Sequence, residues 1–572
     1  MFRVRTGDVT VMQALDRRQM LAAATGLGLC ALLPAWARAG TGKAPEVLSG
    51  EDIRLSIGHA PMTVDGKAGH AIAVNGTVPG PLLRLKEGQN VRLSVTNTLD
   101  EDTSIHWHGL LVPFQMDGVP GVSFPGIKPG ETFVYEFKVR QAGTYWYHSH
   151  SGMQEQEGVY GPIVIDPATP DPVAYDREHV VVLSDYSFLH PHQLMRKLKA
   201  HAGYFNDQKQ TVAGLLAGRD QSLKDRVEWS KMRMDPTDIL DVTGSTYRYL
   251  INGQGSGDNW TGLFTPGERV RLRFVNAGGM TIFNVRVPGM TMSVVQADGQ
   301  NVRPVSVEEF QIAPAETYDV IVKPAEDRAF TLVAEASDRS GMARGTLAPR
   351  LGMSAPVPAL RARPLATMKD MGMDMSAHAG HDMSGMSMDM RDGANAPGVK
   401  LGPGVQTISP MPMDRLGEPP QGLEGVGHKV LVYTDLVALD PNPDPRPPGR
   451  TVEIHLTGNM ERFMWAFDGE AFGPLKTPIA FRRDERARVL LVNDSMMAHP
   501  IHLHGHFFEV VSGHEGRQPR KHTVNVAPGA KVAFDLTADE PGDWAFHCHM
   551  LMHMHAGMFN VVTVRPLDEA PA

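Results

Sequence analysis

The sequence predicts an all-β protein made of three tandem Greek-key β-barrel domains. Short stretches of β-branched and apolar residues alternate with Gly- and Pro-rich turns along most of the chain, and helical periodicity is rare. The chain has 572 residues, enough for several domains of about 100–200 residues each. One pair of strands also recurs three times in the same order, which indicates three copies of one unit.

The first recurring strand follows a turn and ends at an asparagine in each copy: Lys86–Asn97, Pro266–Asn276 and Asp484–Asn493. The second begins after Pro129, Pro314 and Pro528. These repeats predict domains at residues 45–168, 175–350 and 426–566. The last two copies lie 38 residues further apart than the first two. Residues 351–425 account for this excess, and their Pro, Gly and Met content without a strand pattern predicts a linker.

Residues 1–39 have the organisation of an export signal. Arg17 and Arg18 precede the uncharged stretch Met20–Ala37, and a small-x-small cleavage site ends at Ala39. The paired arginines are similar to twin-arginine signals, which the twin-arginine export machinery reads. We therefore expect cleavage near Ala39. A retained membrane anchor is the alternative, but the stretch is short and interrupted by Gly and Pro.

The composition restricts the function. The net charge of −9 disfavours nucleic acid as a partner. Two cysteines exclude a disulfide scaffold or a thiolate zinc module, and only Cys548 remains after the signal. The 24 His and 32 Met residues are thus the main candidate metal ligands.

Histidines recur at fixed distances from the repeat asparagines. His-x-His pairs lie nine and eleven residues after the asparagine in the first and third copies, whereas the middle copy has Val285 and Val287 there. A second set of pairs follows the other shared strand, again in the first and third copies only. A strand directs residues i and i+2 to one face, so each pair can aim two imidazoles at one place. The eight histidines predict a metal cluster between two domains, although imidazole alone does not select the metal; they are His106, His108, His148, His150, His502, His504, His547 and His549.

The third copy adds a different ligand set. His499, Cys548, His553 and Met558 occur only there. At the corresponding positions the first copy has Thr103, Ser149, Gln154 and Val159. Two His, one Cys and a weak Met are the ligands of a blue-copper centre. The alternative is that Cys548 and Met558 are apolar core residues.

These motifs resemble those of the multicopper oxidase family: His106-Trp-His-Gly109, His148-Ser-His150, His499-Pro-Ile-His-Leu-His-Gly505, and His547-Cys-His549 through to Met558. The resemblance covers essentially the whole mature chain and implies cupredoxin-like domains with four copper ions. It implies a type 1 copper on His499, Cys548, His553 and Met558, and a type 2 copper on His106 and His502. It implies a type 3 pair on His108, His148 and His549 and on His150, His504 and His547. Cys548 is peptide-bonded to His547 and His549, which offers electrons a covalent route toward O2 reduction to water.

Asp117 is the candidate acid of this reaction. It lies in Gln115-Met-Asp-Gly-Val-Pro120 and matches an acid that family members place near the trinuclear centre, for proton delivery or water orientation. The alternative is a simple Asp-Gly turn. Some relatives carry a second acid directly after the residue equivalent to His553, but this chain has Met554 there.

Methionines indicate the substrate. The segment Met368–Met390 contains eight Met together with His378 and His381, and thioethers favour Cu(I). We expect seven more Met to lie around the predicted type 1 site, at positions 460, 464, 496, 497, 550, 552 and 554. Incidental Met in a polar linker, or core filling, is the alternative.

The pattern resembles periplasmic copper-resistance oxidases, which implies periplasmic oxidation of Cu(I) to Cu(II) with O2 and periplasmic copper donor proteins as candidate partners. A laccase-like phenol oxidase and a periplasmic copper-sequestering protein remain the alternatives.

Overall fold

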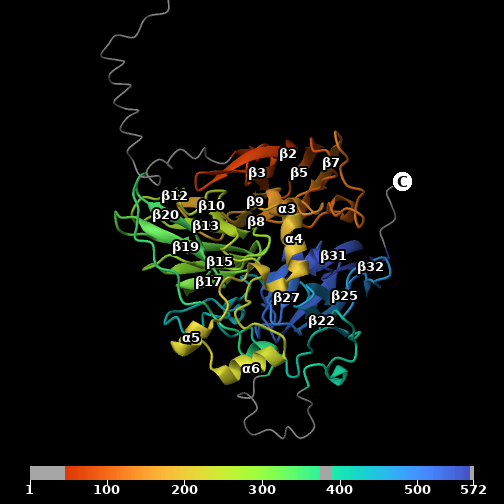
Figure 1. Cartoon of the computed structure of the whole chain (residues 1–572). Coiled ribbons are helices and arrows are strands. Elements are labelled where there is room, and N and C mark those ends of the chain that lie inside the picture. The colour runs from red at the N-terminus through yellow and green to blue at the C-terminus, as the bar shows by residue number, and fades with distance from the viewer. Residues whose placement is uncertain (1–45, 374–388, 567–572) are drawn as a thin grey trace, which may run out of the picture.

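The computed structural model describes residues 46–373 and 389–566. The predicted export signal at residues 1–39 and the centre of the Met-rich segment at 374–388 lie outside the described residues. The described chain forms three β units, each made of two sheets. Figure 1 shows the first unit in red and orange, the second in green and the third in blue. The prediction of a predominantly β, three-domain protein is confirmed.

The first unit packs a five-stranded sheet, ordered β1-β4-β9-β8-β6, on a four-stranded sheet, ordered β3-β2-β5-β7. Strand β2 alternates buried and exposed residues, as expected of a strand with one face on a core. The strands are β1 (Val47–Ser49), β2 (Asp52–Val64), β3 (Lys67–Val74), β4 (Leu82–Lys86), β5 (Asn90–Asn97), β6 (His106–His108), β7 (Thr132–Lys138), β8 (Gly143–His148) and β9 (Tyr160–Asp166).

The second unit has sheets ordered β11-β10-β13-β18-β15-β16 and β12-β20-β19-β14-β17. Every residue of β13 is buried, so this strand is covered on both faces. The strands are β10 (Arg177–Ser187), β11 (Tyr247–Ile251), β12 (Trp260–Leu263), β13 (Val270–Asn276), β14 (Phe283–Arg286), β15 (Met292–Ala297), β16 (Gln300–Val307), β17 (Glu309–Ile312), β18 (Thr317–Val322), β19 (Phe330–Ala336) and β20 (Met342–Ala348).

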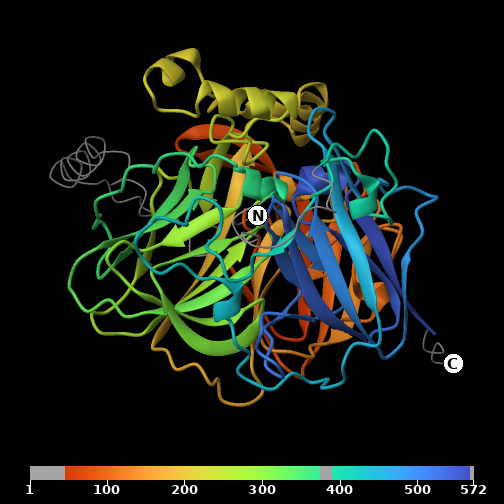
Figure 2. The same ribbon diagram turned by 90° about the horizontal axis from the view of Figure 1, so that it is seen from below.

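The third unit has sheets ordered β23-β22-β25-β30-β27-β28 and β24-β32-β31-β26-β29, with β21 also paired to β30. Figure 2 shows this unit beside the second. The strands are β21 (Met413–Asp414), β22 (Thr451–Asn459), β23 (Met464–Phe467), β24 (Ile479–Arg482), β25 (Glu485–Asn493), β26 (His499–Leu503), β27 (Phe508–Val510), β28 (Arg520–Lys521), β29 (Thr523–Val526), β30 (Ala530–Ala538), β31 (Gly542–Cys548) and β32 (Phe559–Arg565).

The two strands repeated in the sequence are neighbours in all three units. They form the antiparallel pairs β5–β7, β13–β18 and β25–β30. A parallel neighbour lies on the other side of the first strand of each pair: β2, β10 and β22. Parallel neighbours far apart in sequence require crossover connections, as in a Greek-key arrangement.

Helices are few and short. Helices α5 and α6 lie together along one edge of the molecule (Figure 2). Among residues 46–373 and 389–566, no helix is both long and apolar enough to cross a bilayer. The α-helices are α3 (Gln154–Glu157), α4 (Pro191–Ala200), α5 (Val212–Leu216), α6 (Leu223–Lys231) and α7 (Leu551–His555), and 3-10 turns lie at Phe114–Met116, Ala202–Phe205, Met368–Met371, Gly393–Asn395 and Tyr433–Asp435.

The segment predicted as a linker, residues 351–425, is attached to the second and third units in its described parts. Its Arg361 guanidinium forms ion pairs with the buried acids Glu309 and Glu335. Its Ser409 backbone N–H donates to the carboxylate of Asp494 at 2.9 Å. The two-residue strand β21, which the sequence did not predict, extends the third unit by pairing with β30.

The asparagine that ends each repeated strand bonds to the chain that follows it. In the middle unit the Asn276 side-chain amide donates to the carbonyls of Thr281 and Ile312, both at 2.9 Å, and its oxygen accepts the Gly278 N–H. Asn97 and Asn493 make equivalent bonds in their own units. All three side chains are fully buried. The repeat asparagine therefore fixes where the chain turns after this strand, which is where the His-x-His pairs follow.

We expect Asn276→Ala to lower the free energy of unfolding of the protein by about 2–4 kcal/mol, because three buried bonds are lost at about 1 kcal/mol each. Calorimetric unfolding measures the effect. Ser306→Ala, on the exposed face of β16, is the control and should stay within about 0.5 kcal/mol of the parent. Equal stability of the two variants would contradict this role for Asn276.

Candidate metal centre

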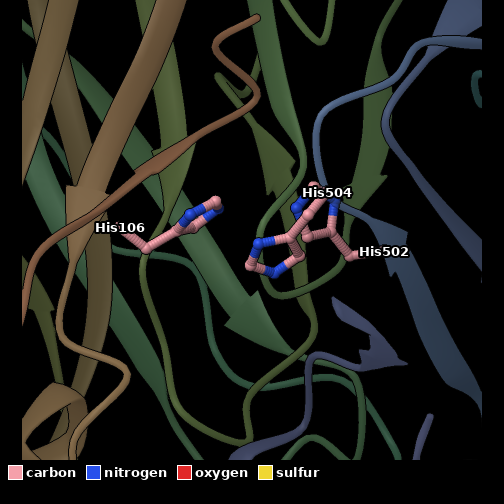
Figure 3. A group of neighbouring side chains, drawn as sticks. All are labelled: His106, His502 and His504. Atoms are coloured by element: carbon pink, nitrogen blue, oxygen red, sulfur yellow. The ribbon is translucent and has the colours of Figure 1, made fainter. Parts of the chain in front are cut away.

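The four His-x-His pairs converge where the first unit meets the third. Strand β6 pairs with β8, which places His106 opposite His148, and β26 pairs with β31, which places His502 opposite His547. Figure 3 shows His106 of the first unit facing His502 and His504 of the third. Seven of the eight rings are buried, and His150 is half-buried.

The ring nitrogens of these histidines lie close together, both across the interface and within the third unit. The Nε2 atoms of His148 and His549 are 3.3 Å apart, and those of His504 and His547 are 3.1 Å apart. His106, His502 and His504 each offer a nitrogen within 4.8 Å of the others. The predicted histidine cluster between two domains is therefore present in the structure.

Outward hydrogen bonds orient these rings. His106 Nδ1 donates to the Asp117 carbonyl and His502 Nδ1 to the His522 carbonyl, both at 2.7 Å. The Nε2 atoms of both rings, and that of His150, are buried without a hydrogen-bond partner among the described residues. A metal-binding histidine ordinarily donates its other N–H to a carbonyl or carboxylate, so this pattern fits metal ligands.

Burial and mutual repulsion lower the pKa of most cluster imidazoles, His502 and His504 among them. Such rings are neutral at pH 7, and a neutral ring keeps the free lone pair that a metal requires. The residues present therefore fit a multinuclear metal centre.

A second centre lies inside the third unit. Cys548 Sγ is 3.6 Å from His499 Nδ1 and 3.7 Å from His553 Nδ1, and all three side chains are fully buried. Both rings use their outer Nε2 elsewhere: His499 bonds Ser495 Oγ at 2.8 Å, and His553 donates to Asp241 Oδ2 at 2.7 Å. The two imidazoles therefore present Nδ1 to the same point as the thiol.

Cys548 requires a metal if it is to act as a thiolate. Burial raises the pKa of its thiol well above the usual range, so the bare side chain stays protonated, and metal coordination deprotonates such thiols. Met558, the predicted fourth ligand, is fully buried, and its carbonyl accepts the Cys548 N–H at 3.1 Å. A soft two-His, one-Cys set favours copper.

The same positions in the other units are occupied differently. In the first unit, Thr103 and Ser149 both donate to the side-chain oxygen of Gln154, at 2.6 and 3.0 Å. Three hydrogen-bonded polar residues thus replace His499, Cys548 and His553. In the middle unit, Val285 and Val287 stand at the positions of His502 and His504 and are buried in the core.

Asp117 lies behind the histidines rather than among their metal-facing atoms. Its Oδ2 is 2.8 Å from His504 Nδ1, its carbonyl accepts from His106, and it is fully buried. The Asp-Gly turn is also real: Gly118 has φ +83°, and a Cβ there would lie 1.8 Å from the Ile105 carbonyl oxygen. Asp117 therefore forms the turn and also orients two histidines.

Three polar residues next to these centres were missed by the sequence analysis. Asp241, which anchors His553, comes from the middle unit. Glu155 on α3 has Oε2 2.7 Å from His148 Nδ1 and Oε1 3.8 Å from His549 Nδ1. His522 groups with His108 and His502. None of the three belongs to a repeated motif, so only the tertiary structure could identify them.

The methionines near the second centre are largely core residues. Met460, Met496, Met497, Met550 and Met552 are buried. Met464 and Met554 are half-buried. Met373 and Met390, which flank residues 374–388, pack against the core that contains Cys548. The described ends of the Met-rich segment therefore contact the hydrophobic core that the second and third units share.

The chain belongs to the multicopper oxidase family. Three family models, each described as multicopper oxidase, match residues 56–170, 179–349 and 445–568. This family has type 1, type 2 and type 3 copper sites and uses O2 as oxidant. The two histidine-rich centres lie in the first and third matched regions.

Among known proteins, the chain is similar to copper resistance protein A of Escherichia coli, at 46% identity over 90% of this chain and 93% of that one. It is 47% identical to a copper resistance protein A homolog of Pseudomonas syringae pv. tomato, over 98% of this chain and 99% of that one. The Mycobacterium tuberculosis multicopper oxidase MmcO is 29% identical over 89% of this chain and 86% of that one.

Solved structures share the fold. Fet3p, a multicopper oxidase that functions in iron import, superposes with a TM-score of 0.63 at 20% identity, covering 90% of each chain. The laccase of Botrytis aclada also has a TM-score of 0.63, at 21% identity over 92% of this chain and 90% of that one.

We expect Glu155→Ala to weaken copper binding at the histidine cluster by about 10- to 100-fold, the usual effect of losing a group that orients a ligand. Copper per protein after dialysis against a graded chelator measures this. Glu157→Ala, in the same short helix, is the matched control, because Glu157 faces His190 instead. Equal copper retention by the two variants would show that Glu155 does not orient the ligands.

Proposed function

We propose that this protein oxidises Cu(I) to Cu(II) in the periplasm, with O2 as the electron acceptor, and so serves copper resistance. The observation that carries the proposal is the Cys548 centre, joined by single peptide bonds to His547 and His549 of the histidine cluster. The names of the similar copper resistance proteins support the physiological role.

The residues assigned to each copper follow the family pattern. His499, Cys548, His553 and Met558 would hold type 1 copper, and His106 and His502 type 2 copper. His108, His148 and His549 would hold one type 3 copper, and His150, His504 and His547 the other. Bound copper would supply one-electron oxidation at the first site and four-electron reduction of O2 to water at the second.

The chain contributes orientation and proton handling. His106 and His504 are held from behind by Asp117, and His553 by Asp241, which keeps the nitrogens that face each centre in place. Asp117 is also an acid in direct contact with these rings, through which a proton could reach the cluster. Trp465 lies against His553, with ring centroids 4.0 Å apart, and covers this ligand from one side.

Cu(I) as substrate is supported by the methionines. The Met-rich segment supplies thioethers, which bind Cu(I) in preference to harder ions, and its described ends pack on the hydrophobic core that the second and third units share. Export by the twin-arginine machinery, with cleavage near Ala39, would place the enzyme in the periplasm, where donor proteins could deliver copper.

The first test is O2 uptake by the copper-loaded protein supplied with Cu(I), compared with a diphenol. We expect uptake with Cu(I). Cys548→Ser should abolish uptake and the blue absorption, because the thiolate ligand is lost, and cells that carry this variant should lose copper tolerance. Uptake with the diphenol alone would favour a laccase-like phenol oxidase, and tolerance that survives Cys548→Ser would favour sequestration.

The second test addresses the Met-rich segment. Replacing Met375, Met383, Met386 and Met388 together by Ser should raise the KM for Cu(I) about tenfold, which corresponds to about 1.4 kcal/mol of binding free energy. Turnover of the diphenol should not change. Replacing Ser376, Ser384 and Ser387 by Ala in the same segment is the control. An unchanged KM for Cu(I) would exclude recruitment by these methionines.

A further inference from the structure

Three buried charged side chains, Glu316, Lys521 and Asp298, form a row that leads toward the histidine cluster from the side of the middle unit. We call this set the Lys521 row. At its centre is Lys521 of β28, whose side chain is fully buried. Its ammonium nitrogen lies 3.1 Å from Asp298 Oδ1 and 3.2 Å from Glu316 Oε1. Both acids belong to the middle unit, so the row crosses the boundary between the second and third units.

The outer end of the row reaches a pocket. The Tyr433 hydroxyl donates to Glu316 Oε1 at 2.6 Å, and both residues line a pocket together with Tyr318 and Asn525. Arg415, Leu416 and residues 418–421 form another wall of this pocket, and most of them are half-buried or exposed. Tyr433 is itself half-buried, so the row begins where water can enter.

The inner end reaches the back of the cluster. Asp298 Oδ2 accepts the backbone N–H groups of His522 at 3.2 Å and Thr523 at 3.1 Å, and lies 3.7 Å from His522 Nδ1. Thr523 Oγ1 is 3.2 Å from His502 Nδ1. Polar contacts therefore run from the pocket to Asp298, and the step from Asp298 Oδ2 to His522 Nδ1 beside the cluster spans 3.7 Å.

The row contains one carboxyl group more than a simple buried ion pair would require. One ammonium faces two carboxylates, and burying an uncompensated negative charge is costly. Burial raises the pKa of Glu316 although Lys521 opposes the rise, and Tyr318 and Tyr433 also face this carboxyl. Burial opposes the charge on Lys521, but Asp298 and Glu316 together raise its pKa. With Lys521 charged and both acids ionised, the row carries one net negative charge, and one proton on Glu316 would bring that charge to zero.

We propose that Glu316, Lys521 and Asp298 form a proton relay from this pocket to the histidine cluster. The relay rests on the O2-reducing function, because each O2 reduced to two waters takes up four electrons and four protons. Substrate supplies the electrons, and the relay carries protons alone, with no change of oxidation state in the chain. It offers a route separate from Asp117 in a protein that has Met554 where some relatives have an acid.

The transfer balances at each step. An N–H bond of Lys521 breaks as its proton passes to Asp298, and the lysine regains a proton as the O–H bond of Glu316 breaks. Glu316 is reprotonated from pocket water through the Tyr433 hydroxyl. Asp298 returns to the carboxylate as its proton passes to His522 Nδ1, which lies 3.7 Å from Asp298 Oδ2. His522 in turn releases a proton from its Nε2, which is buried without a hydrogen-bond partner among the described residues. No net charge accumulates in the row.

The test compares Glu316→Gln with Glu309→Gln in copper-loaded, full-length protein. The Glu316→Gln change keeps the size of the side chain and one accepting oxygen but removes the transferable carboxyl proton. Glu309 is the matched control, because it is also a buried acid of the middle unit and pairs with Arg361 away from the row. Copper content, anaerobic bleaching of the blue absorption by the donor, and O2 uptake in H2O and D2O are measured for each variant.

We expect Glu316→Gln to lower O2 uptake by about 100-fold and to increase the ratio of rates in H2O and D2O. Copper content and anaerobic bleaching should match the parent. The relay would be overturned if Glu316→Gln kept the O2 uptake and the isotope ratio of the parent protein, or if its anaerobic bleaching were slower. It would also be overturned if Glu309→Gln lost as much O2 uptake as Glu316→Gln. If Glu316→Gln does not fold or load copper, Tyr433→Phe is used as the test of the relay instead. This variant should lower O2 uptake and increase the ratio of rates in H2O and D2O. Unchanged values of both would overturn the relay.

The donor is whichever of Cu(I) or the diphenol supports O2 uptake by the parent protein. A wrong substrate assignment therefore leaves this experiment intact. If the parent protein takes up no O2 with either donor, both the proposed function and the relay fail. If the parent is active and the Glu316 and Tyr433 variants behave like it, the relay alone fails.

Discussion

The burial of so many neutral imidazoles between two domains is the constraint on which the rest of the structure depends. Each of these imidazoles places ring nitrogens in the protein interior. A polar atom that is buried there without a hydrogen-bond partner lowers the stability of the fold by about 1–3 kcal/mol. The protein satisfies the outer nitrogens with fixed partners, such as the Asp117 and His522 carbonyls, and leaves inner ones such as His106 Nε2 unpaired among the described residues. This is the arrangement expected when a metal completes the interior, so stability and copper content should be coupled.

Duplication of one β unit explains how this arrangement is built. The repeat asparagine ends the same strand in all three units and bonds to the chain beyond it, so residues at equal distances from it occupy equivalent places. The units differ in what occupies those places. In the first unit, hydrogen-bonded Thr103, Ser149 and Gln154 stand where the third unit has the predicted ligands of its second centre. In the middle unit, Val285 fills the core at the position of His502. One scaffold therefore supports a copper site, a polar cluster or a plain core.

The middle unit carries none of the predicted copper ligands but still contributes to both centres. Its Asp241 anchors His553 from outside the third unit, and its Asp298 supports the turn at His522 and Thr523 behind the cluster. Acids held by a neighbouring domain can orient ligands without competing for the metal, because they contact only the outer nitrogen. Docking of the middle unit is thus part of the geometry of the site.

The sequence by itself determined the three-unit β architecture and pointed to the residues of the two centres. It could do so because the period of a strand and the spacing of a repeat can both be read directly from the order of the residues. The paired histidines converge, and Cys548 lies beside His499 and His553.

The roles of Glu155, Asp241, His522 and the Lys521 row were decided only by the tertiary structure. Each of these reaches a partner in another unit, which no local pattern identifies, since their positions follow from how the units dock. The segment 351–425 likewise has no strand pattern of its own. In its described parts, including β21, the path of the backbone is set by the surfaces against which the segment packs.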